Sequence, residues 1–591
     1  MQFSLELEEL GLKNVSTKSI EELVETAERN IESLFLAGHQ VAVNFSGGKD
    51  SSVCLNLVLQ CAAKLAKAGF EPKVMIANAD TKMDQPEIKT HVEAELKKAA
   101  LFAKQNGFSL EGFIASPSVG NEFWVRVIGG LKLPAFPGTN QDCTEALKIT
   151  PILQTRKRMA ALGNQPGIPL VSIVGTRFEE SEVRSARMNA RGETADIPWQ
   201  NKDGDWLLSP IAYWTIENVW EYMGLAMQGA ITAYSDFEEV VRIYRDAGGT
   251  SCSVVSDMVT EGVRSARPCG ARTGCWACTP IGASDKSMEN LIQSDERYHY
   301  LKSLNTLRGF LFATRWDMNR RQWYGRTIKK GYVCVRPDCY GPSMQRELLR
   351  YALTIDAEEE LEARKSGIKP RFQIISPQAL LAIDFVWSLH GFQRPFEALK
   401  IWRDVSMGAR YPVPEVQAFP QVPMPVPRYV HVGTEWDEGP DRLNSGLRNP
   451  LLETFGGSGC MGTRELKGGK VVMDVLTDDS LSVDEESALL VLMLESDRLI
   501  DQYWADDGLS PTYAAFYYLQ LGTVNIADGQ HSRVDQHLRR TSHKARHGLN
   551  KDVDRDILLS KCAPNGSVPM EVKLAFNDIT CRGGQPSLFE I

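Results

Sequence analysis

The fold of this chain of 591 residues is indicated most clearly by residues 39–52, which read HQVAVNFSGGKDSS. The mostly apolar run 39–45 predicts a short strand, and the apolar pattern from Val53 to Leu65 predicts a long helix. Between them, Gly47 and Gly48 let backbone N–H groups approach an anion closely, and the N-terminus of the following helix adds positive potential. The stretch therefore predicts a strand–loop–helix unit that binds phosphate.

The polar side chains of this loop suit the same purpose. The hydroxyls of Ser46, Ser51 and Ser52 can donate to phosphate oxygens. Lys49 can neutralise phosphate charge, and Asp50 can hold a Mg²⁺ ion bound to the same phosphates. The spacing differs from the G-x-x-x-x-G-K-[ST] loop of the common nucleotide triphosphatases. A plain glycine-containing turn is the alternative, but the complete Ser-Gly-Gly-Lys-Asp-Ser run between a strand and a helix favours a phosphate loop.

Strand and helix patterns alternate on both sides of the loop. Further strands are predicted at Lys73–Asn78, near Gly112–Ile114 and at Leu170–Val174. Helical patterns lie between them at His91–Gln105 and Glu145–Ala161, and the first ~40 residues also read as helix. Alternation of this kind argues for a parallel sheet covered on both faces. We therefore expect an α/β fold with a doubly wound, mostly parallel sheet.

Changes in composition predict the domain boundaries. The sheet is expected to end near residue 235, where a region rich in Cys, Gly and Arg begins, and a stretch with six prolines is the best linker candidate. In the last region, Ser482 and Glu485 have the spacing of a capping box before an apolar run. The predicted parts are a phosphate-loop domain at 1–235, a Cys-rich region at 236–350, a helical extension at 351–411, a Pro-rich linker at 412–427 and a C-terminal, mainly helical domain at 428–591.

Three more polar residues follow predicted strands and are candidates for the same site. Asp80 ends the second strand, where an open α/β sheet places its ligands. Arg177 and Arg184 follow the fourth strand and can bind phosphate oxygens through two N–H groups. The alternatives are a turn aspartate for Asp80 and surface ion pairs with neighbouring glutamates for the two arginines.

Four of the twelve cysteines lie close together in the sequence. Cys275 and Cys278 form a C-x-x-C pair that can grip one metal centre, and Cys252 and Cys269 complete four thiolates. Four thiolates suit a [4Fe–4S] cluster, and zinc accepts the same set. A chain without a disulfide scaffold uses closely spaced cysteines more often for metals or catalysis. Spacing alone favours the iron–sulfur cluster, with zinc as the second possibility and no metal as the third.

Cys143 stands apart from these four. It precedes a predicted helix and has Lys148 a little over one turn further on, and both features favour the thiolate form of a cysteine. It is a candidate to carry a persulfide, to contact the substrate or to replace Cys252 as a ligand. An inert, half-buried thiol is the alternative.

The loop resembles the PP-loop of the ATP pyrophosphatase superfamily, which includes sulfate-adenylate reductases, tRNA thiolases and DNA phosphorothioation proteins. Ala79-Asp80-Thr81 is similar to the Asp-Thr that the reductases have at the same place, beside the nucleotide. The resemblance implies cleavage of ATP between the α and β phosphates, transfer of AMP to an acceptor, and pyrophosphate held in the loop.

Four further segments, residues 121–129, 143–151, 273–279 and 285–288, narrow the resemblance. They are similar to the DndC family of DNA phosphorothioation sulfurtransferases, and the related SspD proteins are equally compatible. The likeness covers roughly residues 35–410. It implies a [4Fe–4S] cluster on the four clustered cysteines, a cysteine desulfurase as sulfur donor, and other subunits of a phosphorothioation system that engage DNA.

Composition limits the class of protein. Hydrophobic residues make up 43% and charged residues 24%, which excludes a disordered or collagen-like chain. No apolar run is long enough to span a membrane and the amino terminus lacks a signal-peptide pattern, so we expect a cytoplasmic protein. The net charge of −9 does not attract nucleic acid to the chain as a whole, although the basic segment His531–Lys551 can contact DNA phosphates or dock on an acidic partner.

The sequence leaves three other functions open. A reductase acting on adenylyl sulfate is one, but thiol-dependent members carry a Glu-Cys-Gly-[Ile/Leu]-His motif that the tail around Cys581 lacks. A tRNA thiolase is the second. The third is a subunit without catalytic activity that senses ATP and DNA within an assembly.

Overall fold

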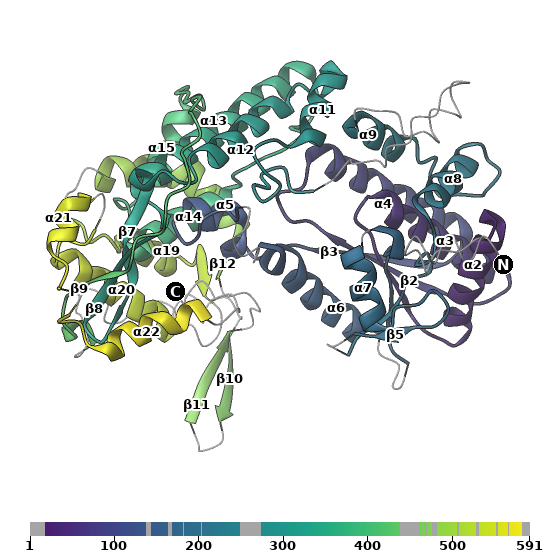
Figure 1. Ribbon diagram of the computed structural model, residues 1–591, viewed down its shortest axis with the longest axis horizontal. Helices are drawn as coiled ribbons and strands as arrows, with labels where there is room; N and C mark the ends of the chain where they lie inside the picture. Colours follow the sequence, from purple (N-terminus) through teal and green to yellow (C-terminus); the bar gives the residue numbers. More distant parts are fainter. Residues whose placement is uncertain are drawn as a thin grey trace. The chain divides into compact units, whose positions relative to one another are not determined.

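The structure of the protein, a computed structural model, divides into two compact units (Figure 1). Unit 1 comprises Met1–Ser116, Lys148–Trp276 and Asp285–Lys302, and unit 2 comprises Pro117–Leu147, Ala277–Ser284 and Ser303–Ile591. The residues that the structure describes are 18–136, 143–163, 168–180, 182–201, 204–248, 274–437, 461–466, 470–475, 481–504, 508–526, 531–550, 553–564 and 566–581.

Unit 1 contains a six-stranded sheet with the order β3-β2-β1-β4-β6-β5. All neighbouring strands are parallel except β5, which runs antiparallel to β6. The predicted α/β fold with a mostly parallel sheet is therefore confirmed. The strands are β1 (Val41–Asn44), β2 (Lys73–Ala79), β3 (Ser109–Ala115), β4 (Val171–Ile173), β5 (Trp199–Gln200) and β6 (Trp206–Leu208).

Helices cover both faces of this sheet, as the alternation of side chains along β1 shows. Val41 and Val43 belong to the large core that also contains the buried side chains of α2, α3, α4, α8 and α9. Ala42, between them, packs with Met159 of α6 on the other face. The helices of unit 1 are α2 (Ile20–Leu36), α3 (Lys49–Lys67), α4 (Pro86–Asn106), α6 (Thr150–Gly163), α7 (Glu182–Arg191), α8 (Ile216–Met227), α9 (Glu238–Gly248) and α11 (Lys286–Ser294).

The strand order places a switch point beside β1. From β1 the chain adds β2 and β3 on one side of the sheet, and then returns to add β4 on the other side of β1. Open α/β sheets bind ligands outside the carboxyl ends of the strands at such a point. A ligand site is therefore expected at the loop after β1 and the loop after β4.

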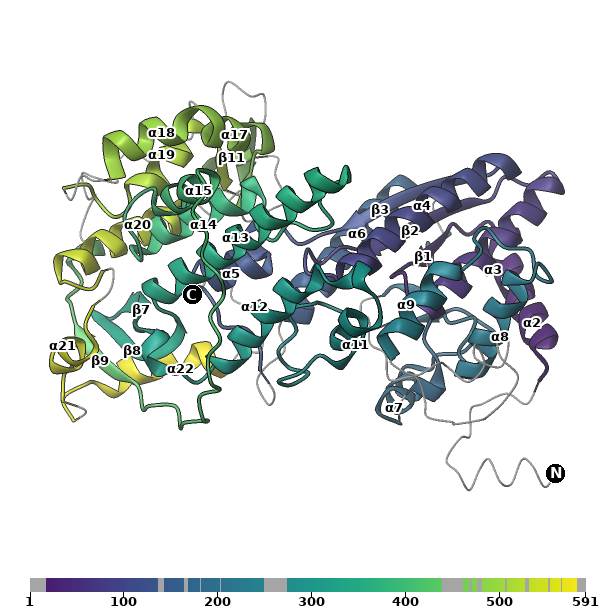
Figure 2. The same cartoon turned by 90° about the horizontal axis from the view of Figure 1, so that it is seen from above.

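Unit 2 is mainly helical and includes a three-stranded antiparallel sheet, β7 (Arg321–Lys329), β8 (Tyr332–Tyr340) and β9 (Arg428–His431). Its central helix, α14 (Pro377–His390), is buried from Ala379 to its end and packs on α5, α15, α19 and α20 (Figure 2). The other helices include α5 (Phe123–Ile128), α12 (Leu301–Ala313), α13 (Pro342–Ser366), α15 (Glu397–Ser406), α17 (Glu485–Leu490), α18 (Ser496–Leu499), α19 (Tyr513–Leu521), α20 (His531–Arg546), α21 (Arg555–Ser560) and α22 (Met570–Cys581).

Two short antiparallel pairs complete the strands described in unit 2, β10 (Met461–Leu466) with β11 (Lys470–Val475) and β12 (Leu481–Val483) with β13 (Val524–Ile526). The Pro-rich segment 412–427 has no helix or strand and lies within unit 2. No helix of the described ranges has both the length and the apolar character that a membrane span requires.

The predicted capping box at Ser482 is wrong. Ser482 lies inside β12, opposite Asn525 of β13, and the pairing of buried Leu481 with Ile526 keeps this segment extended. The helix therefore begins later, at Glu485, and the side chain of Asp484 caps it by accepting from the N–H of Ser487 at 2.8 Å.

The first part of the basic segment 531–551 forms α20, His531–Arg546, and this helix buries part of its charge. Lys544 is fully buried, and its ammonium group donates to the carbonyl oxygen of Arg326 at 3.1 Å. Burial, together with the charges of Arg326 and Arg540, lowers the pKa of Lys544 to about 7. Lys544 is thus part of the packing of unit 2, and Arg533 and Arg546 remain exposed for the predicted DNA contact.

Replacing Lys544 with methionine is expected to change how stability depends on pH. The unfolded chain keeps a lysine pKa near 10.5, so between about pH 7 and pH 10.5 it binds a proton that the folded protein lacks. Stability of the wild type should rise through this window, by about 2 kcal/mol from pH 7 to pH 9, relative to Lys544→Met. Urea unfolding at both pH values measures this difference. Exposed Lys67→Met is the control, and a pH-independent difference between Lys544→Met and wild type would refute the buried neutral lysine.

Candidate functional site

The loop Ser46–Gly48 connects β1 to α3 at the switch point of the sheet. Gly47 has a φ of +74°, and a Cβ added there would lie 2.4 Å from Cγ2 of Val92 on α4. Only glycine combines this backbone conformation with this close approach. Gly48 is the N-cap of α3 and no side chain caps the helix, so the first N–H groups of α3 remain available to an anion.

Serine hydroxyls brace the loop from inside. Ser51 Oγ donates to the carbonyl oxygen of Gly48 at 2.9 Å and accepts from the N–H of Ser46 at 3.2 Å. The two hydroxyls of Ser46 and Ser51 lie 3.1 Å apart. Ser52 is completely buried on α3. Ser51 thus supports the loop itself, Ser52 is buried in α3, and Ser46 is exposed where the loop turns.

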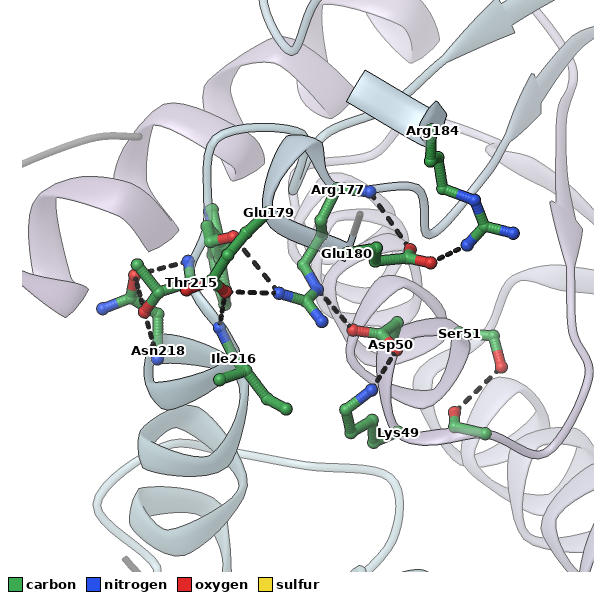
Figure 3. A network of polar contacts seen from close by, with 12 residues as sticks. Lys49, Asp50, Ser51, Arg177, Glu179, Glu180, Arg184, Thr215, Ile216 and Asn218 are labelled. Carbon is green, nitrogen blue, oxygen red and sulfur yellow. Dashed lines mark hydrogen bonds and ion pairs between the residues drawn. The ribbon is translucent and has the colours of Figure 1, made fainter. Parts of the chain in front are cut away.

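A chain of charged groups links the loop to the segment after β4 (Figure 3). Lys49 Nζ lies 2.6 Å from Asp50 Oδ2, and Arg177 Nε lies 2.7 Å from Asp50 Oδ1. Arg177 Nη1 continues to Glu179 Oε2 at 3.0 Å, and Glu179 also accepts from the N–H of Ile216 at the start of α8. The side chain of Arg177 is only 3% exposed, so this network is held by burial as well as by charge.

This network changes what Asp50 can do. Both of its carboxylate oxygens already accept from cations, so the donor set does not fit a Mg²⁺ ligand without losing Lys49 or Arg177. Asp50 instead positions the ammonium group of Lys49 beside the loop. Arg177 in turn positions Asp50.

Arg184 lies outside this buried network. It is on α7, its side chain is half exposed, and it forms an ion pair with Glu180 (Figure 3). This ion pair is the alternative that the neighbouring glutamates predicted for Arg184. A phosphate contact by Arg184 stays a prediction and would require this pair to open.

Asp80 lies at the same edge of the sheet, directly after β2. It accepts from the N–H of Lys82 at 2.8 Å and lies 3.3 Å from the ammonium of Lys82 and 3.7 Å from that of Lys89. Burial by itself would raise the pKa of Asp80, but the two lysines and this hydrogen bond hold it below its usual value. Asp80 is therefore charged near neutral pH.

The first cysteine of the C-x-x-C pair lies beside this edge. The N–H of Trp276 donates to the carbonyl of Met83 at 2.9 Å, and the N–H of Gln85 donates to the carbonyl of Gly274 at 3.3 Å. This short antiparallel bridge brings Cys275 Sγ within 3.6 Å of the hydroxyl of Thr81, next to Asp80. Unit 1 thus places a half-buried thiol at the carboxyl end of β2.

The predicted metal site stays a prediction. Cys252 and Cys269 lie outside the described residues, and Cys278 belongs to unit 2, where its carbonyl accepts from Arg308 at 3.0 Å. Among the residues that the structure describes, no three His, Cys, Asp or Glu side chains gather in a way that could hold a metal ion. The structure therefore tests neither the [4Fe–4S] cluster nor zinc.

Cys143 belongs to unit 2. It is half-buried and lines a small, mostly apolar pocket with Arg126 and Lys132. Its role as a persulfide carrier stays a prediction.

Sequence reasoning missed two residues that touch the loop. A Cβ on Gly175, two residues after the end of β4, would lie 3.0 Å from the backbone of Asp50, so this glycine lets the two loops approach. Tyr244 of α9 brings its hydroxyl to within 3.2 Å of the position that a Cβ on Gly48 would occupy. The glycine after a central strand was a usable signal for Gly175. Nothing in the sequence near Tyr244 points to the loop.

Comparison with known protein families agrees with this geometry. Residues 40–230 match the family described as the phosphoadenosine phosphosulfate reductase domain. This segment contains the loop, Asp80, Arg177 and the strands β1 to β6. It thus forms a domain of the PP-loop ATP pyrophosphatase superfamily. The comparison with curated proteins gives no match.

Proposed function

We propose that this chain, through its phosphoadenosine phosphosulfate reductase domain, is an ATP pyrophosphatase and sulfurtransferase that adenylates a DNA backbone phosphate and supports its replacement by sulfur. The observation that carries the proposal is the open N-terminus of α3, preceded by Gly47 and Gly48, with Lys49 held beside it by Asp50. Cys275 at the same edge of the sheet supports the sulfur chemistry. The resemblance to the DndC and SspD proteins supplies DNA as the acceptor.

The loop supplies binding and charge stabilisation. N–H groups of the first turn of α3 bind the β and γ phosphates of ATP, and the hydroxyl of Ser46 adds a donor. Lys49, held by Asp50, presents its ammonium group to the phosphates, and Arg177 keeps Asp50 in place. These groups stabilise the negative charge that builds on the departing pyrophosphate. Donors held in fixed positions lower the barrier of the reaction in this way.

The chemistry proceeds in two substitutions. A non-bridging oxygen of a DNA phosphate attacks the α phosphorus of ATP, the bond between the α phosphorus and its bridging oxygen breaks, and pyrophosphate leaves. The sulfane sulfur of a persulfide then attacks the adenylated DNA phosphorus and AMP leaves. A second thiol cleaves the sulfur–sulfur bond, which yields the phosphorothioate and a disulfide. A cysteine desulfurase supplies the persulfide, and other subunits hold the DNA.

The resemblance also implies a Mg²⁺ ion and an iron–sulfur cluster. Asp50 does not fit a Mg²⁺ ligand while Lys49 and Arg177 occupy both of its oxygens, so any Mg²⁺ is carried by the phosphates of the nucleotide. For the iron–sulfur cluster, the four clustered cysteines Cys252, Cys269, Cys275 and Cys278 would be the ligands. An anaerobic absorption spectrum with iron and zinc analysis decides between cluster and zinc.

Replacing Lys49 with alanine is expected to slow pyrophosphate release from ATP roughly 20-fold, the effect of losing one charge-assisted hydrogen bond to phosphate. The assay follows pyrophosphate in the presence of DNA, a persulfide donor and the partner subunits. Lys67→Ala, at the exposed end of the same helix, is the matched control. Release at the wild-type rate by both Lys49→Ala and Asp50→Ala would remove the loop from the proposed reaction.

A reductase acting on a sulfonucleotide is the second candidate, because the matching family carries that name. The two reactions leave different products from different substrates. Sulfite released from adenylyl sulfate, with no pyrophosphate from ATP, supports the reductase. Pyrophosphate release with labelled sulfur in DNA supports the phosphorothioation enzyme, and label in RNA instead indicates a tRNA thiolase.

A further inference from the structure

Tyr244 lies at the phosphate loop although α9 begins after the end of the matched segment 40–230. Its hydroxyl is 3.2 Å from the point that a Cβ on Gly48 would occupy, and the hydroxyl of Ser46 is 3.5 Å from the same point. Gly48 has a φ of −83°, which any residue adopts. Close neighbours, rather than backbone conformation, therefore explain why a glycine suits this position.

The ring of Tyr244 also faces Lys49. The ammonium group of Lys49 lies 5.6 Å from the ring centroid, within the range of a cation–π interaction. The side chain of Lys49 is only 12% exposed, which weakens screening of this attraction by water. Tyr244 thus touches the loop in two ways, through its hydroxyl at Gly48 and through its ring at Lys49.

Packing fixes Tyr244 in this position. Its ring meets that of Trp220 on α8 edge to face, with centroids 5.6 Å apart, and only 9% of Tyr244 is exposed. The helix α9 is anchored at its C-terminal end. There the hydroxyl of Tyr298 donates to Asp246 at 2.9 Å and the side chain of Asn290 donates to the carbonyl of Ala247 at 3.0 Å. A side chain held in this way needs little ordering when a ligand binds.

We propose that Tyr244 is a phosphate-binding residue of this site. Its hydroxyl donates a hydrogen bond to an oxygen of the pyrophosphate portion of ATP, and its ring holds Lys49 over the loop. The inference rests on the proposed binding of ATP at the loop and adds a residue that neither the family match nor the sequence pattern indicates. It also makes α9 part of the nucleotide site.

Tyr244→Phe removes the hydroxyl and keeps the ring contacts with Trp220 and Lys49. We expect the Kd of ATP and of inorganic pyrophosphate to rise about tenfold, because a hydrogen bond to a charged group is lost. The Kd of AMP, which lacks the pyrophosphate portion, should stay unchanged. Isothermal titration of the full-length chain with each of the three ligands measures these constants.

Tyr298→Phe is the matched control, because it removes a hydroxyl that anchors α9 without reaching the loop. It should bind all three ligands as the wild type does. Equal loss in Tyr298→Phe, or weaker binding of AMP in Tyr244→Phe, would show that α9 has moved and would overturn the inference. Unchanged binding of ATP by Tyr244→Phe overturns this inference alone, whereas a wild type that binds no ATP overturns the proposed function and this inference with it.

Discussion

Replacing Gly47 with alanine is expected to abolish ATP binding and pyrophosphate release, with a loss of about 1000-fold or more. A φ of +74° costs an alanine about 1–2 kcal/mol. The added Cβ would also lie 2.4 Å from Cγ2 of Val92, a contact that forces the loop away from α4. Because the loop itself presents the N-terminus of α3 to phosphate, a shift of about 1 Å misplaces every donor at once.

The measurement is titration with ATP together with thermal unfolding of the variant. Gly112→Ala is the matched control, since a Cβ on this strand residue of unit 1 meets nothing within 4 Å. We expect Gly112→Ala to bind ATP normally. Normal ATP binding by a folded Gly47→Ala protein would contradict the assignment of the loop as the phosphate site.

Replacing Arg177 with methionine is expected to reduce kcat about 100-fold or more and to destabilise unit 1 by about 3 kcal/mol. The buried guanidinium group joins Asp50 to Glu179, and its loss leaves both carboxylates without their shared cation. Asp50 is then free to turn, so it no longer positions Lys49 for the phosphates. Stability falls because the remaining carboxylates are only 19% and 29% exposed.

Steady-state kinetics and urea unfolding test this expectation. Arg177→Lys should restore little of the lost kcat or stability. The planar guanidinium of Arg177 donates to Asp50 through Nε and to Glu179 through Nη1, and a single ammonium group cannot make both contacts in this geometry. Lys64→Met, which breaks an ion pair with Glu32 at a lysine that is 67% exposed, is the control and should cost less than about 1 kcal/mol. A kcat equal to that of the wild type in Arg177→Met would show that this network has no part in the reaction.

Local patterns were enough to predict the loop and the strands β1 to β4, but not β5 and β6. The mostly apolar run 39–45 contains the strand β1 (Val41–Asn44), and the glycine pair after it has one glycine with positive φ, as a close turn into a helix requires. These features depend on residues only a few positions apart. For the same reason the helix after the loop and the strands β2 and β4 lie where their patterns placed them.

The charged groups of the site were predicted by type but not by arrangement. Asp50 was expected to hold Mg²⁺, whereas the structure ties it to Lys49 and Arg177. Arg177 and Arg184 looked equivalent in sequence, yet the first is buried against the loop and the second is exposed beside Glu180. Which carboxylate oxygen pairs with which cation depends on how two loops from different strands are brought together. The spacing of residues along the chain does not determine this arrangement.

The sequence by itself determined that a strand, a glycine-rich phosphate loop and a helix follow one another, because backbone conformation and apolar spacing are short-range properties. Only the tertiary structure decided that Cys275 lies at Thr81, that Lys544 is buried without a carboxylate partner among the described residues, and that Tyr244 reaches Gly48. Each of these contacts joins elements distant in sequence, and their positions follow from how the apolar faces of whole helices and strands pack.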